Sequence, residues 1–297
     1  MSTPAATGGA RSAERQAAAI KAVVLGVCCA AVIVPFVGVV STSLANQAQV
    51  TRSGGFVLIP SHVSLAAYQA ILSGGVVTRA AGISILITAV GTFLSLVSSA
   101  LLGYGLSRPG SFGHKPLLMI VLFALLFTPG IIPSYLVVQS LHLLNSWWSL
   151  ILPLTINAFN VIVLRAFFME LPREVIESAR IDGASDLQIL WRIVLPLSRA
   201  ALAVIGLFYA VGYWNAFFQA LLYINDDAKW PLSMVLRTYV VNNSSLGVDQ
   251  VGGTAALPPQ QALQMAILVL SLVPILIVYP FLQRHFTKGV LVGAVKG

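Results

Sequence analysis

Six apolar stretches constrain this chain more than any other feature of its sequence. A helix of about 20 apolar residues crosses the roughly 30 Å hydrocarbon core of a bilayer, and the chain is 58% hydrophobic and only 9% charged. We therefore expect an all-α polytopic membrane protein with six transmembrane helices and both termini on one side. The predicted spans cover about residues 22–44, 80–106, 116–138, 150–168, 200–222 and 262–282.

Lysine and arginine residues are distributed unequally between the two sides of these spans. Thirteen of the seventeen lie on the side of the termini, and the other four are Arg52, Arg79, Lys229 and Arg237. The positive-inside rule places the richer side in the cytoplasm, which also explains the net charge of +8 without a nucleic-acid partner. We expect a cytoplasmic tail at residues 1–21, which is disordered over residues 1–16. The transmembrane domain covers residues 22–297 and includes outer segments at 45–78 and 223–260.

The polar stretch between the fourth and fifth spans, residues 165–199, contains five of the nine acidic residues of the chain. Pro172 suits the first position of a short helix, because its missing N–H would be unpaired there. Gly183 is expected to end this helix, since glycine adopts the left-handed conformation without a Cβ penalty. The helix would carry one apolar edge, made of Val175, Ile176 and Ala179.

A second short helix is predicted directly after this glycine. Ser185 and Gln188 have the spacing of a capping box, and Pro196 marks the point where the helix gives way to the fifth span. Its apolar positions recur at i, i+3, i+4 and i+7 and are Leu187, Leu190, Trp191 and Val194. Such a hairpin, joined to two spans, can receive motion from a soluble partner that has a groove for its apolar edge. A hairpin that merely lies on the membrane is the alternative.

The sequence lacks the motifs of catalysis and of energy conversion. It contains no G-x-x-x-x-G-K-[ST] loop, no His/Glu zinc motif and no G-x-S-x-G elbow. Cys28 and Cys29 are adjacent in an apolar run and suit neither a metal site nor a disulfide framework. None of the predicted spans has an internal Asp, Glu or Lys, although ion-coupled transporters usually carry such groups near the bilayer midplane. We expect a subunit with no catalytic residue and no metal, driven by energy from another protein.

Several motifs in this sequence carry a resemblance to a known family. LPREVIESARIDGAS is followed by IVLPL and then by YAVGYWNAF, and this run resembles the cytoplasmic EAA loop of ABC importer permeases of the MalG-like carbohydrate-uptake type. TPGIIPSYLVVQSLHLLNSWWSLILP and the ending FTKGVLVGAVKG resemble the LplC branch of these permeases. Ser178 stands where the family usually has alanine, and Ala200 stands near a position where many relatives have proline.

The resemblance implies a binding-protein-dependent ABC permease fold and a place in a heteromeric carbohydrate importer, with an oligosaccharide as the favoured cargo. The implied location is the bacterial cytoplasmic membrane, where the chain contacts membrane lipid. The implied partners are a second, related permease, two ATPase subunits that hold ATP and Mg, and an extracellular solute-binding protein; no cofactor is expected in this chain. An importer for a non-sugar solute, a channel or secondary transporter, and a signalling or scaffold protein remain alternatives. Within a coupling loop at residues 170–196, the implied ATPase-coupling residues are Glu174, Glu177, Ser178, Ala179, Asp182, Gly183 and Ala184.

Two further groups of residues are candidates for contact with the cargo or with the binding protein. Amides and aromatic rings suit the hydroxyl groups and C–H faces of sugars, although packing between helices is an equally simple role for them. The outer loop at 223–260 stands where relatives have a loop that faces the binding protein, and a plain solvated loop is the alternative. The substrate-path candidates are Asn157, Asn160, Tyr209, Tyr213, Trp214 and Asn215, and the outer candidates are Asp226, Asp227, Lys229 and Trp230.

Overall fold

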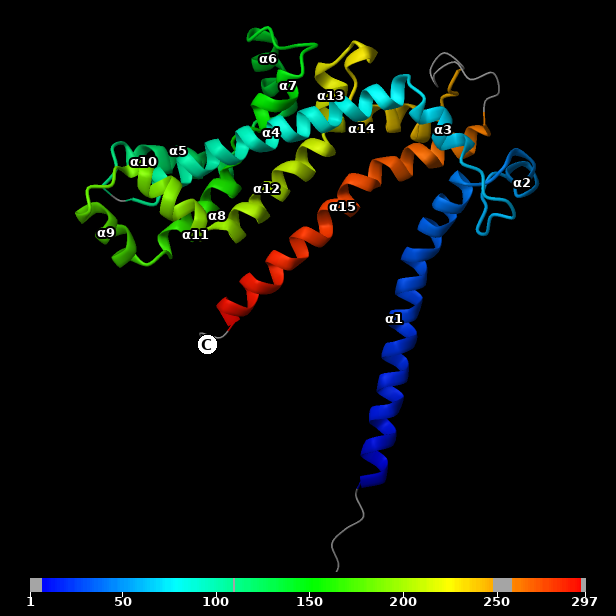
Figure 1. The fold of residues 1–297 in the computed structure, drawn as a ribbon, viewed down its shortest axis with the longest axis horizontal. Helices are drawn as coiled ribbons and strands as arrows, with labels where there is room; N and C mark the ends of the chain where they lie inside the picture. Colours follow the sequence, from blue (N-terminus) through cyan, green and yellow to red (C-terminus); the bar gives the residue numbers. More distant parts are fainter. Residues whose placement is uncertain (1–6, 109, 248–257, 295–297) are drawn as a thin grey trace, which may run out of the picture. The chain divides into compact units, whose positions relative to one another are not determined.

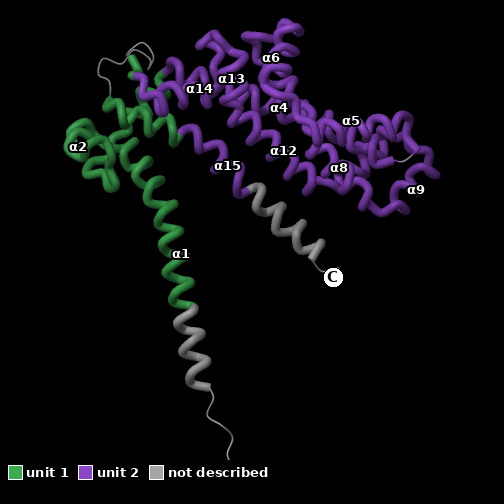
Figure 2. Tube along the Cα trace, turned by 180° about the vertical axis from the view of Figure 1, so that it is seen from behind, with its two compact units in different colours: residues 1–73, 245–269 green, residues 74–244, 270–297 purple. Residues whose placement is uncertain are grey.

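The computed structural model describes residues 7–108, 110–247 and 258–294, with side chains described from 18 to 280 apart from the gaps. All regular elements in this part of the chain are helical. The chain divides into two compact units, which Figure 2 shows in different colours. Unit 1 comprises Met1–Ser73 and Ser245–Val269, and unit 2 comprises Gly74–Ser244 and Leu270–Gly297.

Unit 1 is built on the long helix α1, Thr7–Ser43. This helix begins inside the tail that the sequence predicts to be disordered, because the alanine-rich sequence there favours helix. A hydrogen bond of 2.7 Å between the hydroxyls of Ser43 and Tyr68 ties the end of α1 to α3. The short helices that follow α1 are α2 (Gln47–Arg52) and α3 (Ala66–Leu72), and α15 (Gln260–Ala294) begins in unit 1 and ends in unit 2.

Unit 2 holds the other elements, several of which are labelled in Figure 1. Its central helix is α4 (Val76–Leu106), which packs along both α12 and α8. The remaining elements are α5 (His114–Leu126), α6 (Ile131–Ser140), α7 (Trp148–Ile151), η1 (Leu152–Leu154), α8 (Ala158–Met169), α9 (Arg173–Ile181), α10 (Asp186–Ile189), η2 (Leu190–Val194), α11 (Leu195–Leu197), α12 (Arg199–Trp214), α13 (Phe217–Tyr223), η3 (Asp227–Lys229), α14 (Leu232–Leu236) and η4 (Arg237–Val241).

Three of the six predicted spans are single continuous helices, and the other three are interrupted. Among the described residues, Ala18–Ser43, Val76–Leu106 and Gln260–Pro280 are long and apolar enough to cross a membrane, and up to five spans result if each bent pair of helices counts as one. The third predicted span is divided into α5 and α6, because Pro129 and Gly130 interrupt the helix. The fourth bends by 48° between η1 and α8, and the fifth is divided at Asn215 into α12 and α13. The all-α, membrane-spanning fold class is confirmed.

Small residues four positions apart allow α4 and α12 to approach closely. A Cβ atom on Gly91 would lie only 2.7 Å from the Tyr213 ring. One and two turns further along α4, the buried hydroxyls of Ser95 and Ser99 bond those of Tyr213 at 2.7 Å and Tyr209 at 2.6 Å. Membrane helices commonly pack through such small residues and hydroxyl pairs. This seam brings α12 to the face of α4 and fixes the two tyrosines between the helices.

Candidate functional site

The hairpin that the sequence predicts is present as α9 and α10, joined by a tight turn at Gly183. Gly183 has φ +80°. Its N–H donates to the carbonyl of Arg180 at 3.0 Å, and the N–H of Ala184 donates to the carbonyl of Ala179 at 2.9 Å. These two bonds form a Schellman motif, which requires a left-handed residue. No atom lies within 4 Å of a Cβ built on Gly183, so the backbone conformation, and not lack of space, requires glycine.

The other predicted helix ends of the hairpin are also confirmed, although one of them lies one residue away from its predicted position. Ser185 Oγ accepts the N–H of Gln188 at 3.4 Å, and Gln188 Oε1 accepts the N–H of Ser185 at 2.8 Å, which completes the predicted capping box. The first helix begins at Arg173 with Pro172 as its N-cap, one residue later than predicted. The helical run Asp186–Leu197, which begins with α10, bends by 85° into α12 just beyond Pro196.

The predicted apolar edge of α9 is divided between two sides of the hairpin. Ile176 and Ala179 pack against the hydrophobic core of unit 2 and do not form the free edge that the sequence predicts. Val175 is exposed, and the end of the helix adds Ile181, whose exposed fraction is 87%. The hairpin has to cover the ends of its own spans, so one apolar face is used within the chain. The face left for a partner is therefore displaced toward the turn.

The stripe predicted for the second helix is divided in the same way. Leu190 and Val194 are buried in the core, whereas Leu187 and Trp191 are exposed by 61% and 57%. Residues Leu190–Val194 form a turn of π-helix, η2, which has a wider turn than the α-helix assumed by the i, i+3, i+4, i+7 spacing. We define the hairpin tip as the exposed apolar residues Val175, Ile181, Leu187 and Trp191.

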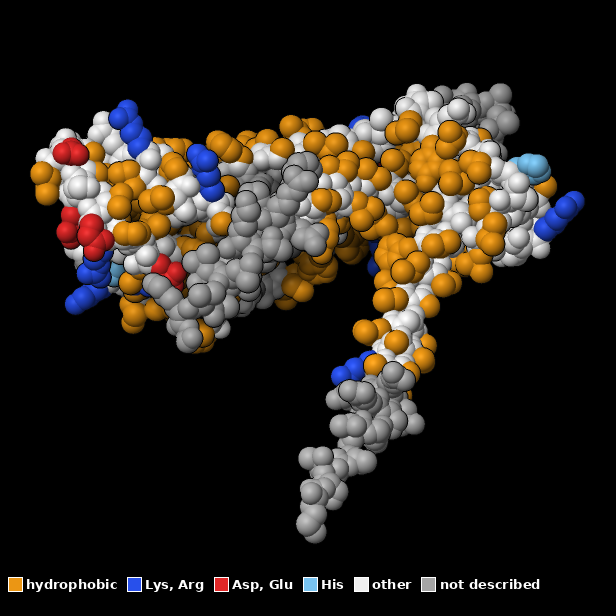
Figure 3. All heavy atoms as spheres, turned by 60° about the horizontal axis from the view of Figure 1, so that its bottom comes forward, with side chains coloured by type: hydrophobic (Ala, Val, Ile, Leu, Met, Phe, Trp, Pro, Cys, Tyr) orange, Lys and Arg blue, Asp and Glu red, His pale blue; other side chains and the backbone are white. Residues whose placement is uncertain are grey.

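The polar coupling candidates lie on the surface near this tip. The side chains of Glu174, Glu177, Ser178 and Asp182 are exposed, whereas Ala184 is half-buried against the core. Figure 3 shows acidic side chains gathered at this end of unit 2, with apolar side chains among them. Arg173, Arg180 and Arg192 are exposed on the same hairpin, so this mixed surface suits a partner groove with an apolar floor and a rim that carries charges of both signs.

Two arginines, which the sequence placed only on the basic side of the membrane, join separate helices at the hairpin end of unit 2. Arg108 Nη1 lies 2.6 Å from Asp186 Oδ1, and its guanidinium carbon lies 5.0 Å from the centre of the Tyr104 ring. Arg165 Nε donates to the carbonyl of Leu106 at 2.8 Å. The ends of α4, α8 and α10 are thereby joined beside a cavity of about 500 Å³, which α9 also lines.

Four of the six substrate-path candidates lie around one cavity of about 330 Å³: Asn157, Asn160, Tyr209 and Tyr213. Asn157 caps α8 by accepting the N–H of Asn160 at 3.1 Å, and its own N–H donates to the Tyr209 hydroxyl at 3.1 Å. The hydroxyls of both tyrosines form hydrogen bonds between helices, which is the packing role that the sequence left open for them. Contact of these residues with a substrate stays a prediction.

Trp214 and Asn215 line a different cavity, of about 290 Å³, where α12 ends. The indole N–H of Trp214 donates to the carbonyl of Ser271 at 3.0 Å. The side chain of Asn215 is exposed, and its Nδ2 donates back to the carbonyl of Val211 at 2.9 Å. The break between α12 and α13 therefore opens a second candidate site beside these two residues.

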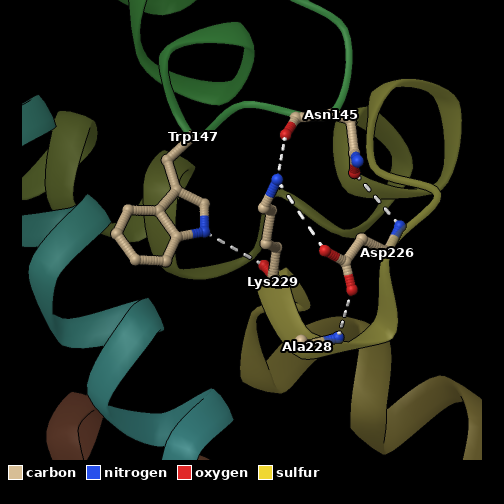
Figure 4. Close-up of polar contacts among 5 residues, drawn as sticks. All are labelled: Asn145, Trp147, Asp226, Ala228 and Lys229. Atoms are coloured by element: carbon tan, nitrogen blue, oxygen red, sulfur yellow. Dashed lines mark hydrogen bonds and ion pairs between the residues drawn. The ribbon is translucent and has the colours of Figure 1, made fainter.

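Two of the outer candidates hold the outer loop to the connection before α7 (Figure 4). The N–H of Asp226 donates to Asn145 Oδ1 at 3.1 Å, and Lys229 Nζ donates to the carbonyl of Asn145 at 2.9 Å. The Lys229 ammonium also lies 3.7 Å from the Asp226 carboxylate, and Trp147 Nε1 donates to the Lys229 carbonyl at 3.2 Å. These contacts give both residues a structural role within the chain.

The other two outer candidates differ in exposure. Trp230 is half-buried and packs against the core of unit 2. Asp227 is exposed, so its carboxylate faces solvent and is accessible to a partner. Contact with a binding protein stays a prediction for all four.

Comparison with known proteins shows which family combines this hairpin with these helices. Residues 22–292 match the family described as "Binding-protein-dependent transport system inner membrane component". The chain belongs to this family. As a member of this family, the chain is a multi-pass permease subunit, and the resemblance to ABC importer permeases is confirmed.

Individual relatives of this inner membrane component are similar over almost its full length. It is 47% identical over 266 residues to the polygalacturonan/rhamnogalacturonan transport system permease protein YtcP of Bacillus subtilis (strain 168), covering 89% of this chain and 93% of the relative. It is 46% identical over 265 residues to protein LplC of the same organism, covering 89% and 90%. Its fold matches a chain of a bacterial ABC transporter involved in the import of the acidic polysaccharide alginate, with a TM-score of 0.85 and 30% identity over 96% of this chain and 100% of that one.

Proposed function

We propose that this permease imports a carbohydrate, with an oligosaccharide as its cargo, and forms half of the translocation path. Relatives named for polygalacturonan/rhamnogalacturonan and alginate transport support this cargo. The chain would work with a second, related permease and with an extracellular solute-binding protein. Two separate ATPase subunits would bind ATP and Mg, and the permease itself would carry out no catalysis.

The observation that carries the ATP-driven part of this proposal is the exposed hairpin tip. Ile181, with 87% of its surface exposed, stands next to a turn whose backbone is held by the Schellman bonds around Gly183. An exposed apolar side chain on a rigid helical hairpin is the usual anchor of a helix that binds in a groove. We infer that the tip binds the ATPase subunits and that the hairpin lies in the cytoplasm, as the distribution of basic residues indicates.

Motion of the ATPases would reach the spans through two physical connections. The Arg108–Asp186 ion pair joins α10 to the end of α4, and the run after α10 continues through the 85° bend into α12. Because α12 packs along α4, a tilt of the hairpin shifts the helices that line the cavities near Tyr209 and Asn215. Closure and opening of the ATPase pair would thereby alternate the access of the path.

Reconstituted transport tests the proposed function. The permease is assembled with its partner permease and ATPases in proteoliposomes that contain ATP, and the loaded binding protein is added outside. Uptake of a radiolabelled oligosaccharide should require ATP, Mg and the binding protein together. ATP-independent uptake driven by an ion gradient would instead indicate a secondary transporter and overturn the proposal.

A further inference from the structure

The cavity at the end of α12 contains a charged residue that the sequence analysis did not assign to any site. Arg237 is the single charged residue among the described residues that line this cavity. The walls include the aromatic rings of Trp214 and Phe217 and the exposed amide of Asn215. Aromatic and apolar walls with a few convergent polar groups are typical of small-molecule sites.

The surroundings of Arg237 leave its N–H groups available to a ligand. Its guanidinium carbon lies 5.2 Å from the centre of the Phe217 ring, and stacking on a ring restrains the group while its in-plane donors stay free. The two ion pairs found in the described part of the chain are Arg108 with Asp186 and Lys229 with Asp226. Neither involves Arg237, and its side chain is exposed, so water is the partner that an incoming anion would replace.

We propose that this cavity is a subsite for a sugar that carries a carboxylate, and that Arg237 binds this carboxylate. The guanidinium fork matches a carboxylate with two parallel hydrogen bonds. Phe217 holds the guanidinium in place, Trp214 contributes an aromatic wall for the C–H side of a pyranose ring, and Asn215 offers an amide to its hydroxyls. This inference rests on the proposed carbohydrate import and narrows its cargo to oligosaccharides that contain a uronate.

Uptake by the complete reconstituted transporter tests this subsite. The probes are an oligogalacturonide, its methyl ester of the same length, and a neutral oligosaccharide. Arg237→Gln should lower uptake of the free acid about tenfold or more, because it removes a charged hydrogen bond, and should change uptake of the ester less than about twofold. Arg237→Lys should retain part of the activity, since a point charge replaces the fork.

The control is Arg79→Gln, which removes an exposed arginine of unit 2 that does not line the cavity and should leave uptake of all three probes unchanged. Unchanged uptake of the free acid by Arg237→Gln, or import of neutral sugars alone by the wild type, would overturn the inference and leave the proposed function standing. A loss confined to vesicles with anionic lipid would assign Arg237 to a lipid phosphate and also overturn it. Failure to import any carbohydrate would overturn both proposals.

Discussion

Arg108 and Asp186 form an ion pair of 2.6 Å that links the segment after α4 to the first turn of α10. The Arg108 guanidinium is also stacked on Tyr104 in the last turns of α4. Because the Asp186 side chain is 68% exposed, the pair contributes less than about 1 kcal/mol to stability. Its importance lies in position: it holds the hairpin at a defined angle to a central helix of the permease.

Exchanging the charges of this pair provides a test of that role. Arg108→Glu places two carboxylates side by side and should lower uptake several-fold while ATP hydrolysis continues, since the hairpin no longer moves α4. The double variant Arg108→Glu/Asp186→Arg should restore most of the uptake. Lys115→Glu, the same charge change in an exposed residue near the start of α5, serves as the control. If the double variant is no better than the single one, the ion pair does not position the hairpin.

Gly183 provides a second test, on the backbone of the turn. A β-branched residue at φ +80° is strained by roughly 1–2 kcal/mol or more, and no collision contributes because the space around it is open. Gly183→Val should insert and assemble yet lose uptake, whereas Gly183→Asn should retain more, because asparagine tolerates the left-handed region. Gly82→Val, at a helical glycine with equally open surroundings, is the control. Full uptake by Gly183→Val would remove the turn from the coupling mechanism.

The contact between Gly91 and Tyr213 predicts a defect of stability. A Cβ at position 91 would lie 2.7 Å from the Tyr213 ring, and overpacking of this kind costs about 1–3 kcal/mol. Gly91→Ala should therefore lower the melting temperature of the detergent-purified complex by several degrees. Gly105→Ala, on the same helix with no atom within 4 Å, should not lower it. Equal melting temperatures for both variants would mean that α4 and α12 are farther apart than this.

The orientation of the chain can be measured by cysteine labelling. Cys28 and Cys29 are first replaced, because both are exposed on α1. A cysteine at Ser244 should then react with a membrane-impermeant maleimide from outside, as the asymmetry of basic residues predicts. A cysteine at Ser111, in the short loop before α5, should react only after permeabilisation. The reverse pattern would place the hairpin outside the cell and contradict ATPase coupling.

The features that could be predicted from the sequence are local, and those that could not are contacts between distant segments. The turn at Gly183, the capping box at Ser185 and the bend after Pro196 each depend on a few neighbouring residues, so their residue types reveal them. No sequence spacing links Arg108 to Asp186 or Ser95 to Tyr213, because these pairs form only when separate helices pack. Nor does an apolar edge reveal what covers it, which is why Ile176 was assigned to a partner although it packs against the chain's own core.

Co-purification of the ATPase subunits with the tagged permease tests the central claim most directly. The wild-type permease should retain both the second permease and the ATPases, because the hairpin tip fills a groove on the ATPase. Ile181→Asp, which places a charge on the side chain with 87% exposure, should retain the second permease and lose the ATPases. Leu141→Asp, which changes an exposed apolar residue at the end of α6, should retain all partners. An Ile181→Asp permease that still purifies with its ATPases and imports sugar at the wild-type rate would contradict the coupling role of the hairpin.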